Sequence, residues 1–137
     1  MDIERFRNKQ GFTLIELLMV MAIIGVLVSI FYWRIIEVKD RAYIATMESD
    51  LRLFTTHQES YYGDAGTYTA DLNTLAAAAL MGGFNLSDGV QFTVHEADAT
   101  GWSATATHNL STRTCAIFVG QASPPGAATH EGAVACN

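Results

Sequence analysis

The sequence predicts an α+β fold in which a long N-terminal α-helix packs on a small antiparallel β-sheet. An unbroken apolar run covers residues 12–33, and residues 35–62 contain neither Pro nor Gly. The second half of the chain alternates apolar and polar residues between turn signals, as half-buried strands do. With 137 residues, the chain is long enough for one domain and too short for two ordinary ones.

The apolar run has the length and composition of a membrane span. Glu16 is its only charged residue, and a transmembrane helix needs about 20 apolar residues. The alternative is the buried core helix of a soluble domain, but such a helix usually keeps a polar stripe. The run therefore favours a transmembrane segment over residues 12–33.

The charges around the run predict its orientation and exclude one class of partner. Arg5, Arg7 and Lys9 precede it and would hold the N-terminus in the cytoplasm. The net charge is −6 and no basic patch follows residue 34, so nucleic acid is not expected as a partner.

A basic start followed by an apolar run also occurs in secretory signal peptides, which are cut beyond the run after small residues. Here the run ends in Tyr32, Trp33 and Arg34, where no such site exists. The small residue, Gly11, lies before the run instead. We therefore expect the apolar segment to be retained.

Residues 9–27 read KQGFTLIELLMVMAIIGVL. This string closely resembles the class III signal of type IV pilins and pseudopilins, in which a membrane aspartyl peptidase cuts after the glycine and methylates the new N-terminus. The resemblance implies cleavage between Gly11 and Phe12, N-methylation of Phe12, and loss of residues 1–11 as a leader peptide. Glycine suits the site because an extended backbone without a side chain enters a protease cleft easily.

Glu16 stands out because burying an acid in a membrane is unfavourable by about 2.5–3.5 kcal/mol on insertion scales. The resemblance implies that Glu16 neutralises the Phe12 amine of a neighbouring subunit and so sets the register of assembly. Alternatively, Glu16 extends to the cytoplasmic headgroups.

The resemblance also implies partners and a location. The subunits would form a helical homo-oligomeric filament, assembled by an inner-membrane platform and a cytoplasmic ATPase. The precursor would span the inner membrane once, and the product would be an extracellular pilus. Trp33 departs from the family pattern, because many members carry a helix-bending proline there; Gly25 is a weaker candidate for a bend.

Residues 34–137 are expected to form the amphipathic half of the helix and a globular head of the kind found in pilins. One helix face carries apolar residues at helical spacing and the opposite face carries charges, so a helix over residues 12–62 would be roughly 75 Å long. Gly63 and Gly66 are expected to end it, within a turn-rich connector over residues 61–68. The apolar face comprises Ile44, Met47, Leu51, Phe54 and Tyr61, and the charged face Lys39, Glu48, Arg52 and Glu59.

The rest of the head should hold a short helix over residues 71–81, capped by Asp71 or Thr69 and closed by Gly82 and Gly83. Strands are predicted over residues 90–94, 102–107, 115–120 and 132–136, with a hairpin turn at residues 98–101. One face of this sheet should pack on the helix and the other can meet water.

Cys115 and Cys136 agree with export to an oxidising compartment. If they pair, they close residues 116–135 into a loop, and such a cross-link stabilises a fold by about 3 kcal/mol. In pilins a C-terminal disulfide loop of this kind faces outward. Two free thiols are the alternative.

No catalytic pattern is present, and we expect no enzyme activity, metal or cofactor. The four histidines are scattered without metal-ligand spacing, and each is expected to be a surface or strand residue. A calcium site built from Asp88, Glu96 or Asp98 is not supported by their spacing. The histidines are His57, His95, His108 and His130.

The leading hypothesis is a structural subunit of a type IV pilus-like filament. Within the same family, a pseudopilin or minor pilin of a type II secretion system shares the motif. From another class, a membrane-anchored extracytoplasmic binding module would keep its leader and stay monomeric.

Overall fold

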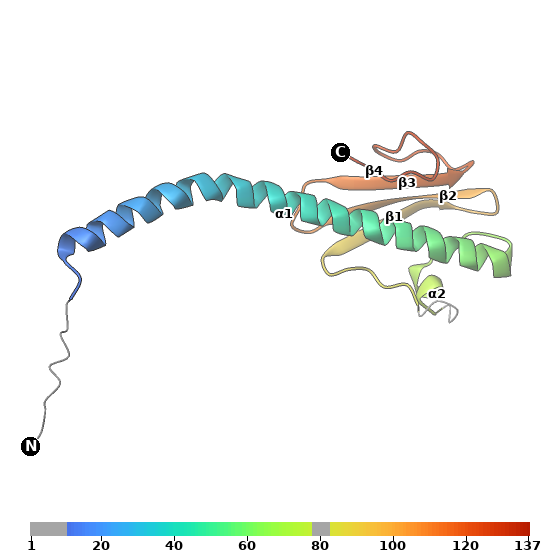
Figure 1. The fold of residues 1–137 in the computed structure, drawn as a ribbon. Coiled ribbons are helices and arrows are strands. Elements are labelled where there is room, and N and C mark those ends of the chain that lie inside the picture. Colours follow the sequence, from blue (N-terminus) through green and yellow to red (C-terminus); the bar gives the residue numbers. More distant parts are fainter. Residues whose placement is uncertain (1–10, 78–82) are drawn as a thin grey trace, which may run out of the picture. The chain divides into compact units, whose positions relative to one another are not determined.

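The computed structural model describes residues 11–77 and 83–137, which form two helices and one four-stranded sheet (Figure 1). The chain divides into two compact units, one ending at Val38 and one covering Lys39–Asn137. The elements are α1 (Leu14–Ala65), α2 (Leu72–Ala77), β1 (Val90–Ala97), β2 (Gly101–His108), β3 (Thr114–Gly120) and β4 (Ala135–Cys136). The predicted α+β class is confirmed.

α1 ends later than predicted. Gly63 lies inside the helix, and the connector expected from residue 61 is helical up to Ala65. Gly66 ends α1 with φ +69°, and its N–H donates to the carbonyl of Tyr62 at 2.8 Å. A single glycine costs a helix only about 1 kcal/mol, and packing of Tyr62 on Tyr68, with ring centroids 4.6 Å apart, favours the extra turn.

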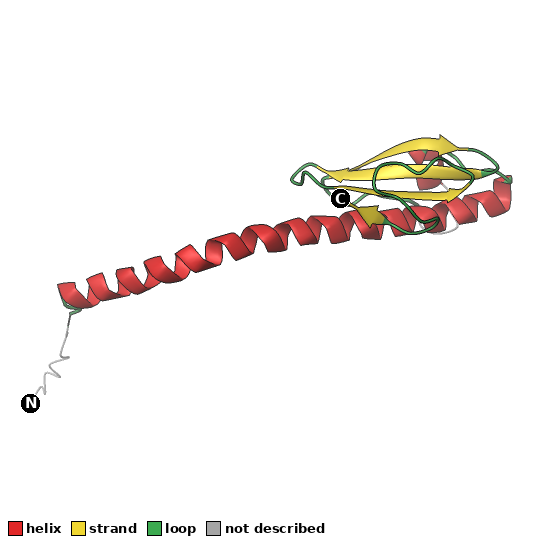
Figure 2. Ribbon diagram, turned by 90° about the horizontal axis from the view of Figure 1, so that it is seen from above, coloured by secondary structure: helices red, strands yellow, loops and turns green. Residues whose placement is uncertain are grey.

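In the unit from Lys39 onward, the C-terminal half of α1 lies across one face of the sheet (Figures 1 and 2). Met47, Leu51 and Phe54 are fully buried, as is Trp102 of β2. The Phe54 ring meets Trp102 edge to face with centroids 4.9 Å apart, a favourable aromatic geometry. The predicted apolar face of the helix therefore forms the core.

The buried face of α1 also carries polar residues that the prediction missed. Asp50 accepts hydrogen bonds from the backbone N–H and hydroxyl of Ser87 at 2.9 and 2.8 Å. Gln58 exchanges two hydrogen bonds with the backbone of Thr69, at 2.5 and 3.1 Å. Both are buried because the loops that cross α1 bring backbone groups that need partners.

Two residues of α1 lie elsewhere than predicted. His57, expected to be a surface or strand residue, is a buried helix residue, only 4% exposed, and packs on Phe84. Glu48, assigned to the outer face, is half-buried, with Oε1 3.7 Å from Cys136 Sγ. The spacing of apolar residues along α1 could not predict either position, because the sheet and its loops cover more of the circumference of the helix than the apolar stripe does.

α2 begins as predicted, with Asp71 as its cap. The Asp71 carboxylate accepts the Thr74 hydroxyl at 2.8 Å and the Asn73 N–H at 2.9 Å. These bonds favour the charged form and hold the pKa of Asp71 below its ordinary value, the Thr74 hydroxyl contributing most. The predicted continuation to residue 81 and Gly82 lie outside the described residues.

The sheet is antiparallel throughout, in the order β1-β2-β3-β4. β1 is longer than predicted because its register shifts between Val94 and Glu96, a β-bulge that interrupts the apolar alternation at His95. The predicted turn after β1 is held by Asp98, whose Oδ1 accepts the Thr100 hydroxyl at 2.7 Å and the Gly101 N–H at 3.1 Å. These bonds and that of the Thr100 N–H lower the pKa of Asp98, the Thr100 hydroxyl most of all.

The far face of the sheet is only partly open to water, which corrects the prediction. Ser103 of β2 and Ala116 of β3 are fully buried although they point away from α1. The segment between β3 and β4 covers them, and Ala122 and Ala128 of that segment are themselves buried. Thr93 and Thr107 on the same face remain exposed.

The cysteines form a disulfide. Cys115 and Cys136 are register partners on β3 and β4, with Cα atoms 4.0 Å apart. The bridge fixes both ends of the segment that covers the far face of the sheet.

Candidate functional site

From Leu17 to Trp33 the helix of the first unit carries no charged residue, and it is exposed on every side. Every large apolar residue from Phe12 to Val38 is at least 47% exposed. By length and composition, α1 contains a segment that could cross a membrane. A surface of this size needs lipid or another protein to cover it.

The helix continues without interruption through Gly25 and Trp33. Ser29, a polar residue within the apolar segment, donates its hydroxyl to the Val26 carbonyl at 2.7 Å. Such a bond satisfies a hydroxyl inside lipid without a second helix. Ala22, Ile23, Val26 and Leu27 line a shallow apolar depression on one face of this segment.

Glu16 is bound to the start of its own helix. Its Oε2 accepts the backbone N–H of Thr13 at 2.8 Å and the Thr13 hydroxyl at 2.9 Å. In return, the Thr13 oxygen lies 3.3 Å from the N–H of Glu16, and the Thr13 carbonyl accepts the N–H of Leu17 at 3.2 Å. This reciprocal pattern is a capping box, which satisfies N–H groups that the first helical turn leaves unpaired.

The Gly11–Phe12 peptide bond lies just outside this cap. Residues 11–13 have no regular secondary structure and are exposed, with Phe12 85% exposed. A Cβ built on Gly11 would meet none of the described atoms within 4 Å. The bond is therefore accessible, and two residues separate it from the first helical residue, Leu14.

The structure thus brings Gly11, Phe12 and Glu16 together around one helix start. It differs from the prediction in one respect: α1 was expected to begin at Phe12, and Phe12 instead precedes the cap. Thr13 is the residue that the prediction missed, although the pattern Thr-x-x-Glu at residues 13–16 is the sequence signature of a capping box. The basic residues Arg5, Arg7 and Lys9 lie outside the described residues.

Over residues 11–77 and 83–137, no three His, Cys, Asp or Glu side chains gather into a group that could hold a metal ion. Of the acids considered for calcium, Asp98 is engaged by its own turn and Glu96 accepts the N–H of Ser123 at 2.9 Å.

Comparison with known proteins agrees with these features. A family described as the prokaryotic N-terminal methylation motif matches residues 6–32. The Type IV wide pilus major component PilA4 of Thermus thermophilus is 32% identical over 106 residues, covering 77% of this chain and 79% of that protein. The Type IV major pilin protein PilA of Myxococcus xanthus is 32% identical over 83 residues, covering 60% of this chain and 38% of that protein.

Proposed function

Because this chain belongs to the type IV pilin family, we propose that it is a structural subunit of a type IV pilus-like filament and polymerises through the N-terminal half of α1. Its role is structural and not catalytic, as in the pilins to which it is similar.

The observation that carries this function is the exposed apolar surface of residues 12–38. A transmembrane helix can exchange lipid contacts for contacts with other helices at little cost, because lipid tails and apolar side chains are equally apolar. The same surface can therefore anchor the precursor in a membrane and pack against copies of itself in a fibre. The apolar depression lined by Ala22, Ile23, Val26 and Leu27 could receive a side chain of a neighbouring helix.

Maturation would remove residues 1–11. A prepilin peptidase would cut between Gly11 and Phe12 and methylate the Phe12 nitrogen. The position of this bond outside the helical cap supports the proposal, because a protease needs several residues of extended chain. Since α1 begins at Leu14, the cut leaves the helix itself intact.

Cleavage would create a positive charge beside the Glu16 carboxylate. Before the cut, Thr13 satisfies Oε2 of Glu16, which lowers the cost of carrying an acid into the membrane. After the cut, the Phe12 amine of a neighbouring subunit can pair with that carboxylate. A charge pair in an apolar bundle is costly when either member is missing, so it would set the axial register between subunits.

The precursor would reside in the inner membrane, with residues 34–137 outside the cytoplasm, and an assembly platform with its ATPase would move it into the extracellular fibre. The disulfide between Cys115 and Cys136 supports an oxidising destination for the head.

The direct test is intact-mass and N-terminal analysis of protein sheared from the surface of the native host. We expect a filamentous fraction whose chain starts at N-methylated Phe12 and is lighter by two hydrogens for one disulfide. A chain that starts at Met1 and stays monomeric in the membrane would contradict the proposal and favour an anchored binding module. A processed chain confined to a short periplasmic fibre would favour a pseudopilin.

A further inference from the structure

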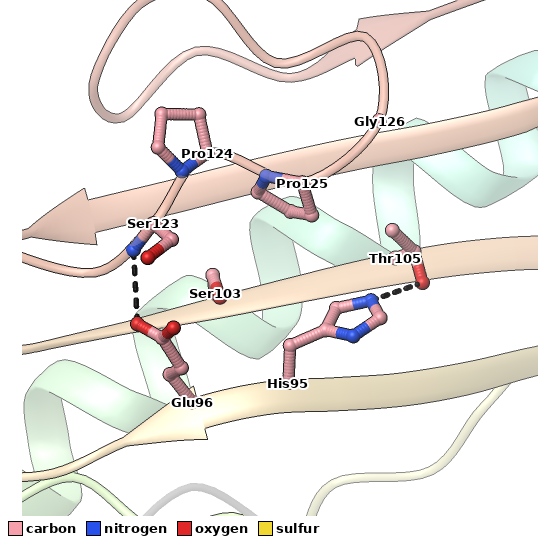
Figure 3. Close-up of a pocket in the computed structure, with 8 residues that line it drawn as sticks. All are labelled: His95, Glu96, Ser103, Thr105, Ser123, Pro124, Pro125 and Gly126. Atoms are coloured by element: carbon pink, nitrogen blue, oxygen red, sulfur yellow. Dashed lines mark hydrogen bonds between the residues drawn. The ribbon is translucent and has the colours of Figure 1, made fainter.

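The head contains a pocket that filament assembly through α1 does not use. It has a volume of about 390 Å³ and lies on the far face of the sheet, under the loop that follows β3 (Figure 3). His95 and Glu96 of β1 and Ser103 and Thr105 of β2 form one side, and residues 123–126 form the other.

The Ser103 hydroxyl is the unusual feature of this pocket. Ser103 is fully buried, and its Oγ has no hydrogen-bond partner among the described residues. Burying an unpaired hydroxyl is unfavourable by about 1–3 kcal/mol, so such a group in a native fold calls for a partner that the described residues do not supply. Figure 3 shows Ser103 between Glu96 and the loop that carries Pro124 and Pro125.

Two neighbouring side chains also have polar atoms that are free to form hydrogen bonds. Oε2 of Glu96 accepts the Ser123 N–H, whereas Oε1 accepts no bond from the part of the chain that the structure describes. His95 Nε2 is bonded to the Thr105 hydroxyl at 3.0 Å, and Nδ1 faces no hydrogen-bond partner among residues 11–77 and 83–137. Pro124 and Pro125 add apolar surface on the loop side.

The charge of the pocket and of the head indicates which class of ligand the lining residues could bind. None of the described residues that line the pocket is Lys or Arg, and Glu96 adds a negative charge, so an anion is disfavoured. Residues 39–137 contain ten acidic and four basic residues, a net charge of −6, which attracts cations to the head. The apolar prolines suit a cation with an aliphatic stem better than a bare metal ion.

We propose that the pocket between Ser103, Glu96 and the Pro124–Pro125 loop binds a primary alkylammonium group. The ammonium would donate to Oε1 of Glu96. A shift of the loop that carries Pro124 and Pro125 would uncover the buried Ser103 hydroxyl as a second acceptor, and the carbon chain would lie against the prolines. The group could belong to a free amine or to a lysine side chain of another molecule, since both present the same chemistry.

The test uses the full chain in detergent micelles, labelled with ¹⁵N, and butylammonium chloride as the probe. We expect saturable shifts of the Ser103, Thr105 and Ser123 amide signals at constant ionic strength. Butanol, which has the same carbon chain without the charge, and glucose, which offers only hydroxyls, should give no saturable shift. Equal binding of either neutral probe, or no binding of butylammonium, would overturn the proposal.

Two variants separate binding from folding. Glu96→Gln keeps an acceptor for the Ser123 N–H but removes the charge, and should weaken butylammonium binding about tenfold. Asp64→Asn makes the same charge change at an exposed site outside the pocket and should alter binding less than about twofold. Similar losses of butylammonium affinity in both variants would show that only the net charge matters, and would refute a defined site.

Ser103→Ala should weaken binding about threefold without lowering the melting temperature, because it removes a hydroxyl that pairs with none of the described residues. Unchanged affinity in this variant would refute the role of Ser103. The source of the amine is then tested by carbodiimide coupling, first without added probe and then with butylammonium present. A Glu96–Lys39 cross-link between two chains would identify a second copy as the donor, and incorporation of added butylamine at Glu96 alone would identify a free ligand.

Discussion

The Glu16 carboxylate accepts hydrogen bonds from both the backbone N–H and the hydroxyl of Thr13, at 2.8 and 2.9 Å. The acid at the start of the apolar helix is thus occupied before any other subunit is present. A residue expected to act only between subunits therefore also has a local task, which is to begin its own helix. The two tasks can be separated by substitution.

Thr13→Ala should loosen the first turn of α1. Loss of a capping hydroxyl costs about 1 kcal/mol, which corresponds to about fivefold faster hydrogen exchange at the N–H groups of Glu16 and Leu17. Exchange measured by NMR on the full chain in micelles checks this. Thr13→Ser keeps the hydroxyl and should restore protection; equal exchange in all three proteins would argue against the cap.

Glu16→Gln should distinguish capping from charge. Glutamine also serves at the fourth position of a capping box, so this variant should keep the protected first turn and normal leader removal. It lacks the charge for the Phe12 amine, and we expect at least about a tenfold loss of sheared fibre. Glu16→Val should lose both the cap and the fibres. Wild-type fibre yield from Glu16→Gln would refute the register role.

Gly11→Ser should block leader removal without disturbing the chain. No described atom lies within 4 Å of a Cβ at Gly11, so the new side chain causes no steric clash with the described residues. The matched control is Gly25→Ser, where the Cβ also meets none of the described atoms. The mass of the membrane-bound protein should show the leader on Gly11→Ser alone. A Gly11→Ser chain that starts at Phe12 would place the cleavage site elsewhere.

Removal of the disulfide should destabilise the head by about 3 kcal/mol, because it frees a loop with a sequence separation of 21. The double variant Cys115→Ala/Cys136→Ala and the reduced wild type should have the same denaturation midpoint, below that of the oxidised wild type. Identical midpoints in oxidised and reduced protein would show that the sheet holds the loop without the bridge.

Asp98 should make the stability of the head depend on acid pH. Its pKa is lower in the folded state than the ordinary carboxyl value of about 3.9. Its stabilising effect is therefore complete above pH about 3.9 and is lost as the pH falls through the lowered pKa of the folded state.

Melting curves of wild type and Asp98→Asn between pH 2 and 6 test this contribution. The wild type should be the more stable protein above pH about 4, and the difference should shrink below it. A difference that stays constant over the whole range would exclude titration of Asp98 as its cause.

Several features of the head could not be read from local patterns. The spacing of Met47, Leu51 and Phe54 correctly predicted the buried face of α1. The same face also buries Asp50 and Gln58, because loops more than ten residues away in sequence present backbone groups to them. Nothing within the helix indicates which polar side chains will meet such loops.

The chain by itself determined the features that depend on neighbouring residues. The apolar run, the Thr-x-x-Glu pattern at residues 13–16, the Asp71 cap and the Asp98 turn all arise within a few residues of sequence. Each works through hydrogen bonds or periodicity over one or two turns, which sequence spacing reports directly.

Tertiary structure decided the rest. Only folding places the β3–β4 segment over Ser103, leaves that hydroxyl unpaired, and opens a pocket between β1 and Pro125. These features depend on how chain segments far apart in sequence cover one another. The physical reason is that burial and desolvation are properties of a packed surface, whereas a sequence pattern records only which residues are adjacent along the chain.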